Sequence, residues 1–245
     1  MAAMAFTAQR MLSLSTTFVF KAIVGFACGG LLVILFANEF LRTHSFGSAN
    51  QVTLARAALT ALLYAAIGEH AALPVAWFVV TTAAIAVTLD GIDGWLARNG
   101  GESTSFGARF DMETDALLIL GVSILSWQHG KAGSWILAAG AMRYIFVAFG
   151  YVLPWLKRGL PYSYRRKVVC VVQSLSLIIS LVPWLTAPVS ALIAFVGLSS
   201  LLASFAVDVA WLLRTHRAQA IGDGRITPWN FFSSGTVRIR TTLIP

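Results

Sequence analysis

The sequence predicts an all-α protein, a polytopic bundle of membrane-spanning helices. Of its 245 residues, 58% are hydrophobic and only 11% are charged, and the mean hydropathy is +0.77. Soluble domains carry about 25% charged and about 45–50% apolar residues. This composition excludes a disordered chain and an ordinary cytosolic enzyme, and the length suits one membrane domain.

Apolar runs long enough to cross a bilayer, about 20 residues each, follow one another with short polar links. We predict six core transmembrane helices and one extra N-terminal helix. The expected spans are 20–41, 53–68, 72–90, 112–128, 133–153, 167–184 and 188–213. The chain therefore divides into an N-terminal apolar segment with a linker (1–49), a six-helix membrane domain (50–213) and a polar cytoplasmic tail (214–245).

Basic residues are distributed unevenly between the two sides of this bundle. The loops and tail on one side hold fourteen Lys and Arg, whereas the loops on the other side hold only Lys131. Cytoplasmic loops are rich in these residues. We therefore expect a protein of the cell membrane whose first side faces the cytoplasm. The net charge of +8 then needs no nucleic-acid partner. Arg10 and Lys21 fit less well, because both lie outside if 20–41 spans; the alternative is a re-entrant or interfacial helix.

Acidic residues are concentrated in one part of the chain. Six of the ten lie between positions 90 and 115, and carboxylates in a membrane protein mark functional sites because they are costly to desolvate. Asp90 and Asp93 are three residues apart at the end of one apolar run and share a helix face. Asp111 and Asp115 are four apart at the start of the next run and also share a face. A polar, Gly-rich linker lets the two helices return antiparallel, which brings all four carboxylates together on the cytoplasmic side.

Four carboxylates at such close range repel one another and require cations. Hard oxygen ligands favour Mg²⁺ or Mn²⁺, and two ions are the economical interpretation, since two-metal sites commonly act on phosphate esters. The neighbouring residues suit a phosphate substrate. Small side chains leave room for it, an arginine guanidinium can pair with a diphosphate, and a hydroxyl can bond to phosphate oxygens. These residues are Gly94, Ala97, Gly107, Arg98 and Thr104.

The run from Asp90 to Asp115 resembles the signature of the CDP-alcohol phosphotransferase family, D-x2-D-G-x2-A-R-x8-G-x3-D-x3-D. All eight fixed positions and all gaps match. Upstream, the segment from Asn50 through Thr53 to Arg56 resembles the N-x-x-T-x-x-R opening of the family's first core helix, although the preceding proline is replaced by alanine. Downstream, 167 and 173 resemble a Lys and a Gln near the start of the fifth helix.

The resemblance implies a homodimeric membrane enzyme with six core helices that moves a substituted phosphate from a CDP-linked donor to an alcohol and releases CMP. It implies that two divalent metals are held by Asp90, Asp93, Asp111 and Asp115, with Asp115 also acting as the general base. The implied donor contacts are Asn50, Thr53, Gly94, Ala97, Arg98, Thr104 and Gly107.

The donor expected for a member of this size is CDP-diacylglycerol, while glycerol 3-phosphate, inositol phosphate, serine and choline stay open as acceptors. Arg166 and Lys167 belong to a basic run that either binds a phosphorylated acceptor or reflects topology and anionic lipids. Arg143 lies within a span, where arginine is costly. It either reaches the acceptor pocket or neutralises Asp208.

Four other interpretations compete with a transferase. The carboxylates could merely form ion pairs with Arg98 and Arg109, but two cations cannot balance six anions. A cation transporter would favour inverted repeats and midplane sites, and an inactive scaffold would have lost metal ligands; neither pattern fits this chain. A metal-dependent lipid phosphatase would use water as the acceptor. Only assays with and without an alcohol distinguish it from a transferase.

Overall fold

The structure, a computed structural model, describes residues 1–41, 47–99, 104–153, 155 and 163–222. Within these ranges the side chains of 32–41, 93, 95–99, 105 and 217–222 lie outside the described part. Every regular element in the described ranges is helical, which confirms the predicted fold class. The elements are α1 Ala2–Leu12, α2 Thr17–Leu41, α3 Ser48–Ala65, α4 Leu73–Asn99, α5 Ser105–Gln128, a 3-10 turn Ser134–Ile136, α6 Leu137–Val152, α7 Tyr164–Ser180 and α8 Ala187–Gly222.

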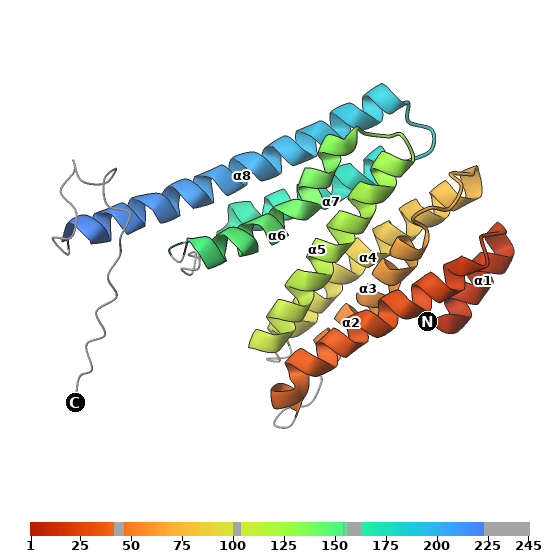
Figure 1. Ribbon diagram of the computed structural model, residues 1–245, viewed down its shortest axis with the longest axis horizontal. Helices are drawn as coiled ribbons and strands as arrows, with labels where there is room; N and C mark the ends of the chain where they lie inside the picture. The colour runs from red at the N-terminus through yellow and green to blue at the C-terminus, as the bar shows by residue number, and fades with distance from the viewer. Residues whose placement is uncertain (42–46, 100–103, 154, 156–162, 223–245) are drawn as a thin grey trace.

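Two helices precede the core, where the sequence analysis expected one. The short α1 precedes α2 and packs beside it (Figure 1). At the other end of the chain, α8 continues beyond the span expected to end at 213, so the first residues of the expected tail are helical.

Consecutive long helices run in alternating directions (Figure 1). The start of α3, the end of α4 and the starts of α5 and α7 therefore lie toward one end of the bundle, which we call the site end. The loops that join α3 to α4, α5 to α6 and α7 to α8 lie at the opposite end. The count of basic residues on each side of the membrane assumed this alternation of helix directions.

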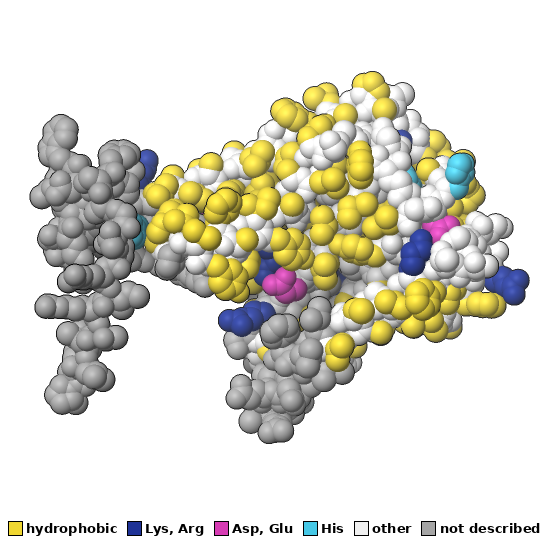
Figure 2. Space-filling view, viewed as in Figure 1, with side chains coloured by type: hydrophobic (Ala, Val, Ile, Leu, Met, Phe, Trp, Pro, Cys, Tyr) yellow, Lys and Arg dark blue, Asp and Glu magenta, His cyan; other side chains and the backbone are white. Residues whose placement is uncertain are grey.

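Three segments of the described chain are long and apolar enough to cross a membrane: Leu73–Ile92, Ser134–Val152 and Ala187–His216. Among the other expected spans, α5 carries four charged residues in its first half, α7 is 17 residues long with a basic start, and Thr17–Leu31 of α2 is a shorter apolar helix. Hydrophobic side chains are spread over the whole described face in Figure 2. Tryptophans at the opposite end fit an interfacial belt, and Trp77 packs edge-on against Trp184 with ring centroids 5.1 Å apart. These features are those of a membrane protein.

Close helix packing depends on small residues at crossing points. A Cβ added at Gly140 of α6 would lie 2.4 Å from the Cα of Leu120 in α5. A Cβ at Gly197 of α8 would lie 2.0 Å from the hydroxyl of Ser176 in α7. Small residues let helix backbones approach closely in membranes, where packing rather than water exclusion drives association. Glycine at these positions therefore holds the bundle together.

The N-terminal helices are attached to the core by a polar network around Glu69, in the loop between α3 and α4. The carboxylate of Glu69 accepts hydrogen bonds from the Ser15 backbone N–H (2.9 Å) and from the Ser15 hydroxyl. The ammonium of Lys21 lies 3.4 Å from the same carboxylate and donates to the Ile67 carbonyl at 2.9 Å. Gln128, at the end of α5, donates to the Glu69 backbone carbonyl at 2.9 Å.

This network explains why Lys21, a basic residue, can lie on the side that holds few basic residues. Lys21 lies at the same end as Glu69, so its charge is neutralised there by an ion pair. Burial raises the pKa of Glu69, but the hydrogen bonds from Ser15 and the charge of Lys21 lower it by more, so the pKa lies below the ordinary glutamate value. The carboxylate is therefore charged at neutral pH and available to hold the N-terminal helices.

We expect Glu69→Gln to loosen α1 and α2 while leaving the core helices folded, because the variant loses the charge that binds Ser15 and Lys21. Hydrogen–deuterium exchange should rise in residues 1–31 and stay unchanged in α7 and α8. Thr7→Val is the matched control, since the Thr7 hydroxyl bonds only within α1, to the Ala3 carbonyl at 2.9 Å. Equal exchange in Glu69→Gln and the wild type would show that the network does not anchor these helices.

Candidate active site

Three aspartates from two helices meet around a single buried arginine at the site end. Arg56 of α3 is 0% exposed, and its guanidinium contacts Asp90 at 2.8 Å, Asp111 at 2.5 Å and also Asp115. One carboxylate oxygen from each aspartate lies within 4.8 Å of the others. The aspartate side chains are about two-fifths exposed, so water and small ions reach the cluster.

The helices place these residues as the spacing predicted. Asp90 is residue 18 of the 27 in α4, and Asp111 and Asp115 lie one turn apart in the first half of α5. Helices α4 and α5 both pack against α3, which lies between the two groups of aspartates. The predicted meeting of Asp90, Asp111 and Asp115 is therefore found. The side chain of Asp93, the fourth predicted ligand, lies outside the described residues, as do those of Ala97 and Arg98.

Arg56 is the residue that the sequence analysis did not assign to the site. Ion pairing was considered only with Arg98 and Arg109, and Arg109 is exposed. The signal was available, because an arginine within an expected membrane span is costly and needs a partner. Its position as the last member of the N-x-x-T-x-x-R run, two turns after Asn50, would have directed attention to it.

A tight contact between α3 and the start of α5 borders the cluster. Thr104 is the N-cap of α5, and its hydroxyl accepts a hydrogen bond from the Gly107 N–H at 3.0 Å. A Cβ added at Gly107 would lie 2.7 Å from the Asn50 side-chain oxygen. Asn50 and Thr53 are buried on α3. The structure thus brings together Asn50, Thr104 and Gly107, three of the residues expected to contact the donor.

Helix α7 approaches the cluster from the other side. It contacts α4 and α5, the two helices that carry the aspartates. Arg166 is one turn before Cys170 and shares its helix face. Lys167, the neighbouring residue expected to bind the acceptor, is exposed, and the basic residues at 157 and 158 lie outside the described part of the chain.

Arg143 pairs with Glu113 rather than with Asp208. Its Nε donates to a Glu113 oxygen at 3.3 Å, and a second bond joins the same side chains. Glu113 is two residues from both Asp111 and Asp115, which places it on the opposite face of α5. An acceptor role for Arg143 stays a prediction, and this contact favours a structural role between α5 and α6.

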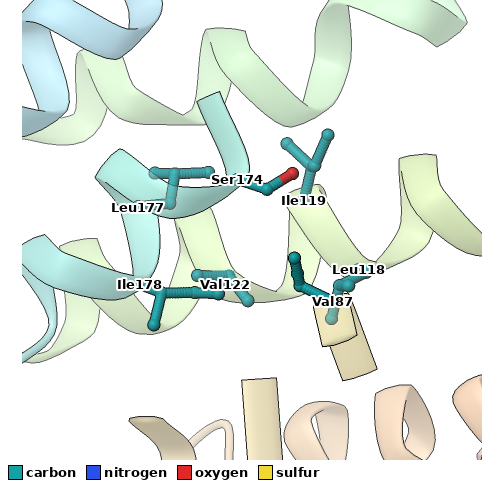
Figure 3. Close-up of a pocket in the computed structure, with 7 residues that line it drawn as sticks. All are labelled: Val87, Leu118, Ile119, Val122, Ser174, Leu177 and Ile178. Atoms are coloured by element: carbon teal, nitrogen blue, oxygen red, sulfur yellow. The ribbon is translucent and has the colours of Figure 1, made fainter. Parts of the chain in front are cut away.

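Below the cluster, an apolar floor separates it from the rest of the bundle. Figure 3 shows a small cavity between α4, α5 and α7, lined by Val87, Leu118, Ile119, Val122, Ser174, Leu177 and Ile178. Its volume of about 10 Å³ is room for about one water molecule. No part of a lipid substrate fits there, so a ligand must approach the aspartates from the exposed side of the cluster.

The cluster has the chemistry of a divalent-cation site. Its donors are hard carboxylate oxygens, as Mg²⁺ and Mn²⁺ prefer. Among the described side chains, three carboxylates contact one buried guanidinium. The carboxylates are also accessible from solvent, which gives an ion a route in.

Comparison with known proteins assigns the chain to a family. A sequence model described as CDP-alcohol phosphatidyltransferase matches residues 46–206, well over half of the chain. The chain belongs to the CDP-alcohol phosphatidyltransferase family. No curated protein sequence and no solved structure gives a significant match. Membership confirms the predicted family and implies a membrane transferase of phospholipid biosynthesis that moves a phosphatidyl group from a CDP-alcohol to an alcohol.

We expect Gly107→Ala to weaken binding of the CDP-linked donor by displacing Asn50, because the new Cβ would fall 2.7 Å from the Asn50 oxygen. Gly91→Ala is the matched control, since a Cβ there meets nothing within 4 Å. The donor KM should rise in the first variant and stay near the wild-type value in the second. Equal donor KM values in both variants would contradict this placement of the nucleotide.

We expect Arg56→Gln to lower the Tm of the metal-free protein by several degrees, since breaking a buried ion pair leaves uncompensated charge. Added Mg²⁺ or Mn²⁺ should restore much of the loss by neutralising the same carboxylates. The measurement is thermal unfolding with EDTA and with each ion, compared with Arg109→Gln, which removes an exposed arginine on α5. A Tm that does not respond to metal in the Arg56 variant would argue against a cation site.

Proposed function

We propose that this protein is a divalent-metal-dependent transferase that moves a phosphatidyl group from CDP-diacylglycerol to an alcohol and releases CMP. The observation that carries the proposal is the group of three aspartates around Arg56, at the end of two antiparallel helices in an apolar bundle. The excess of basic residues on this side supports a position at the cytoplasmic face of the cell membrane. A homodimer is the expected assembly.

The position of the cluster suits a lipid with a nucleotide head group. The aspartates lie toward a helix end, so CDP can approach from water. The exposed apolar side chains of α6, α7 and α8 leave a surface along which acyl chains can lie in lipid. Because the interior cavity is too small for an acyl chain, the tails are expected to stay outside the bundle.

In this proposal the aspartates 90, 93, 111 and 115 hold two Mg²⁺ or Mn²⁺ ions. When bound, the ions supply positive charge that offsets the diphosphate and the departing CMP. On the donor side, Asn50, Thr53, Gly94, Ala97, Arg98 and Gly107 border the nucleotide and diphosphate. The Thr104 hydroxyl can donate to a phosphate oxygen while it accepts the cap bond from Gly107.

The transfer step balances with one proton acceptor. The acceptor hydroxyl oxygen forms a bond to the phosphorus of the phosphatidyl group, and the bond from that phosphorus to the bridging oxygen of CMP breaks. CMP leaves with that electron pair, and the hydroxyl proton passes to the carboxylate of Asp115. Asp115 lies on the same face of α5 as Asp111 and is partly open to solvent. An incoming alcohol can therefore reach it.

A lipid phosphatase would use the same residues with water as acceptor. The decisive assay incubates the purified protein with CDP-diacylglycerol, Mn²⁺ and a panel of alcohols, and measures both CMP and the lipid product. A transferase forms a new phospholipid only when its alcohol is present. CMP with phosphatidic acid as the sole lipid product would identify a phosphatase instead.

We expect CMP release to cease in EDTA and to return with Mg²⁺ or Mn²⁺. Asp93→Asn and Asp111→Asn should lose metal binding. Asp115→Asn should keep much of it but lose turnover by about 10²–10⁴-fold, the usual contribution of a general base. Glu113→Gln is the matched control on the opposite face of α5. Full activity in EDTA, or equal loss of metal in all three aspartate variants, would contradict these roles.

A further inference from the structure

An open apolar groove lies between α1 and the start of α4, at the end of the bundle opposite to the aspartates (Figure 1). Its volume is about 600 Å³, within the range of about 300–1,000 Å³ that small-molecule sites occupy. On each helix the lining residues recur at helical spacing, so each helix contributes one face to the groove. The lining includes Ala3, Met4, Thr7 and Met11 from α1, and Trp77 and Thr81 from α4.

The two hydroxyl groups that line the groove already donate hydrogen bonds within their own helices. Thr7 donates to the Ala3 carbonyl at 2.9 Å, and Thr81 donates to the Trp77 carbonyl at 2.8 Å. The α1 wall also carries two methionines, which are 49% and 79% exposed at positions 4 and 11 and whose flexible side chains adapt to an irregular apolar ligand. A lipid acyl chain suits these walls. A peptide does not, because each of its backbone N–H and C=O groups needs a hydrogen-bond partner.

The groove also lies where lipid is expected. Its α4 wall belongs to Leu73–Ile92, one of the segments long and apolar enough to cross a membrane. Trp77 packs against Trp184 near the start of α4, and tryptophan is enriched at the boundary between head groups and acyl chains. The groove therefore begins near head-group level and continues along α4 into the bilayer. Thr81 is nine residues before Asp90, about 13 Å along the helix, so the groove is separate from the aspartates.

A cation lies at the edge of the groove. Arg10 is exposed, and its guanidinium carbon lies 5.2 Å from the centre of the Phe6 ring. The ring holds the guanidinium in place but does not neutralise its charge. Arg10 is one turn after Thr7 and so lies beside the α1 wall. It is in the last turn of α1, next to the Ser15 contact with the loop between α3 and α4, which places it at the head-group end of the groove.

We propose that the groove between α1 and α4 is a second lipid site, which binds a phospholipid with an anionic head group. One acyl chain lies between the methionines of α1 and the Trp77–Thr81 face of α4, and the phosphate pairs with Arg10. An anionic head group is favoured because its net negative charge is attracted to a cation at the membrane surface. A lipid that contacts both helices also joins the N-terminal helices to the core. This site goes beyond the proposed transferase function, which does not use it.

The test is photocrosslinking of the purified full chain in liposomes of phosphatidylcholine. The probes are phosphatidylglycerol and phosphatidylcholine that carry a diazirine on one acyl chain, and labelled peptides are identified by mass spectrometry. Both probes should label α1 and residues 74–81. The phosphatidylglycerol probe should label them about fivefold more, as expected for one cation facing an anionic lipid. Peptides from the exposed apolar face of α8 give the reference for general contact with the bilayer.

Variants of the groove separate the head group from the acyl chain. Arg10→Gln should remove the preference for phosphatidylglycerol and leave labelling by phosphatidylcholine unchanged. Ala3→Trp fills the groove from α1 and should reduce labelling by both probes. Thr81→Phe fills it from α4 and gives the same test if the first variant disturbs α1. The controls are Thr7→Val, which keeps the size of the groove, and Arg214→Gln, which removes an exposed arginine of α8. Both controls should match the wild type.

Two results would overturn the proposal. Equal labelling of the groove peptides by the two probes in the wild type would show that the head group is not recognised. Labelling no higher than the α8 reference, and unchanged by both filling variants, would show general contact with the bilayer only. Neither result depends on CMP release, so the failure of this proposal is distinct from the failure of the proposed transferase function.

Discussion

The buried guanidinium of Arg56 is the constraint on which the site depends. The Arg56 side chain extends from α3 and is fully buried, and an isolated charge there would be very costly. Three aspartates from α4 and α5 compensate it, and so α3, α4 and α5 must meet at one end of the bundle. The same contact brings carboxylates closer together than their mutual repulsion would otherwise allow. The need to compensate the buried charge on α3 therefore brings together the aspartates of α4 and α5.

The rest of the bundle is held together by apolar packing, so the polar residues are concentrated at the site end. The core of small and aliphatic residues continues to the floor beneath the aspartates, where the cavity between α4, α5 and α7 is too small for a substrate. Substrates must then enter from the water and lipid boundary, which is where a nucleotide head group and acyl chains separate naturally. The glycine contacts between α5 and α6 and between α7 and α8 keep this scaffold close-packed.

Charged residues outside the cluster join helices in pairs. Glu69 holds the N-terminal helices at the opposite end, Glu113 joins α5 to α6 through Arg143, and Asp208 joins α7 to α8. Each pair satisfies a charge that would be costly in a membrane.

The sequence by itself determined the helical membrane fold, the family and the meeting of Asp90 with Asp111 and Asp115. Hydropathy and residue spacing are local properties, and the motif fixes its carboxylates within 26 consecutive positions, 90 to 115. Only the tertiary structure decided the partners of the arginines. Arg56 compensates the aspartates, Arg143 pairs with Glu113, and Asp208 holds residues 165 and 166. Ion pairs between distant helices depend on helix rotation and crossing, which spacing along one chain segment does not specify.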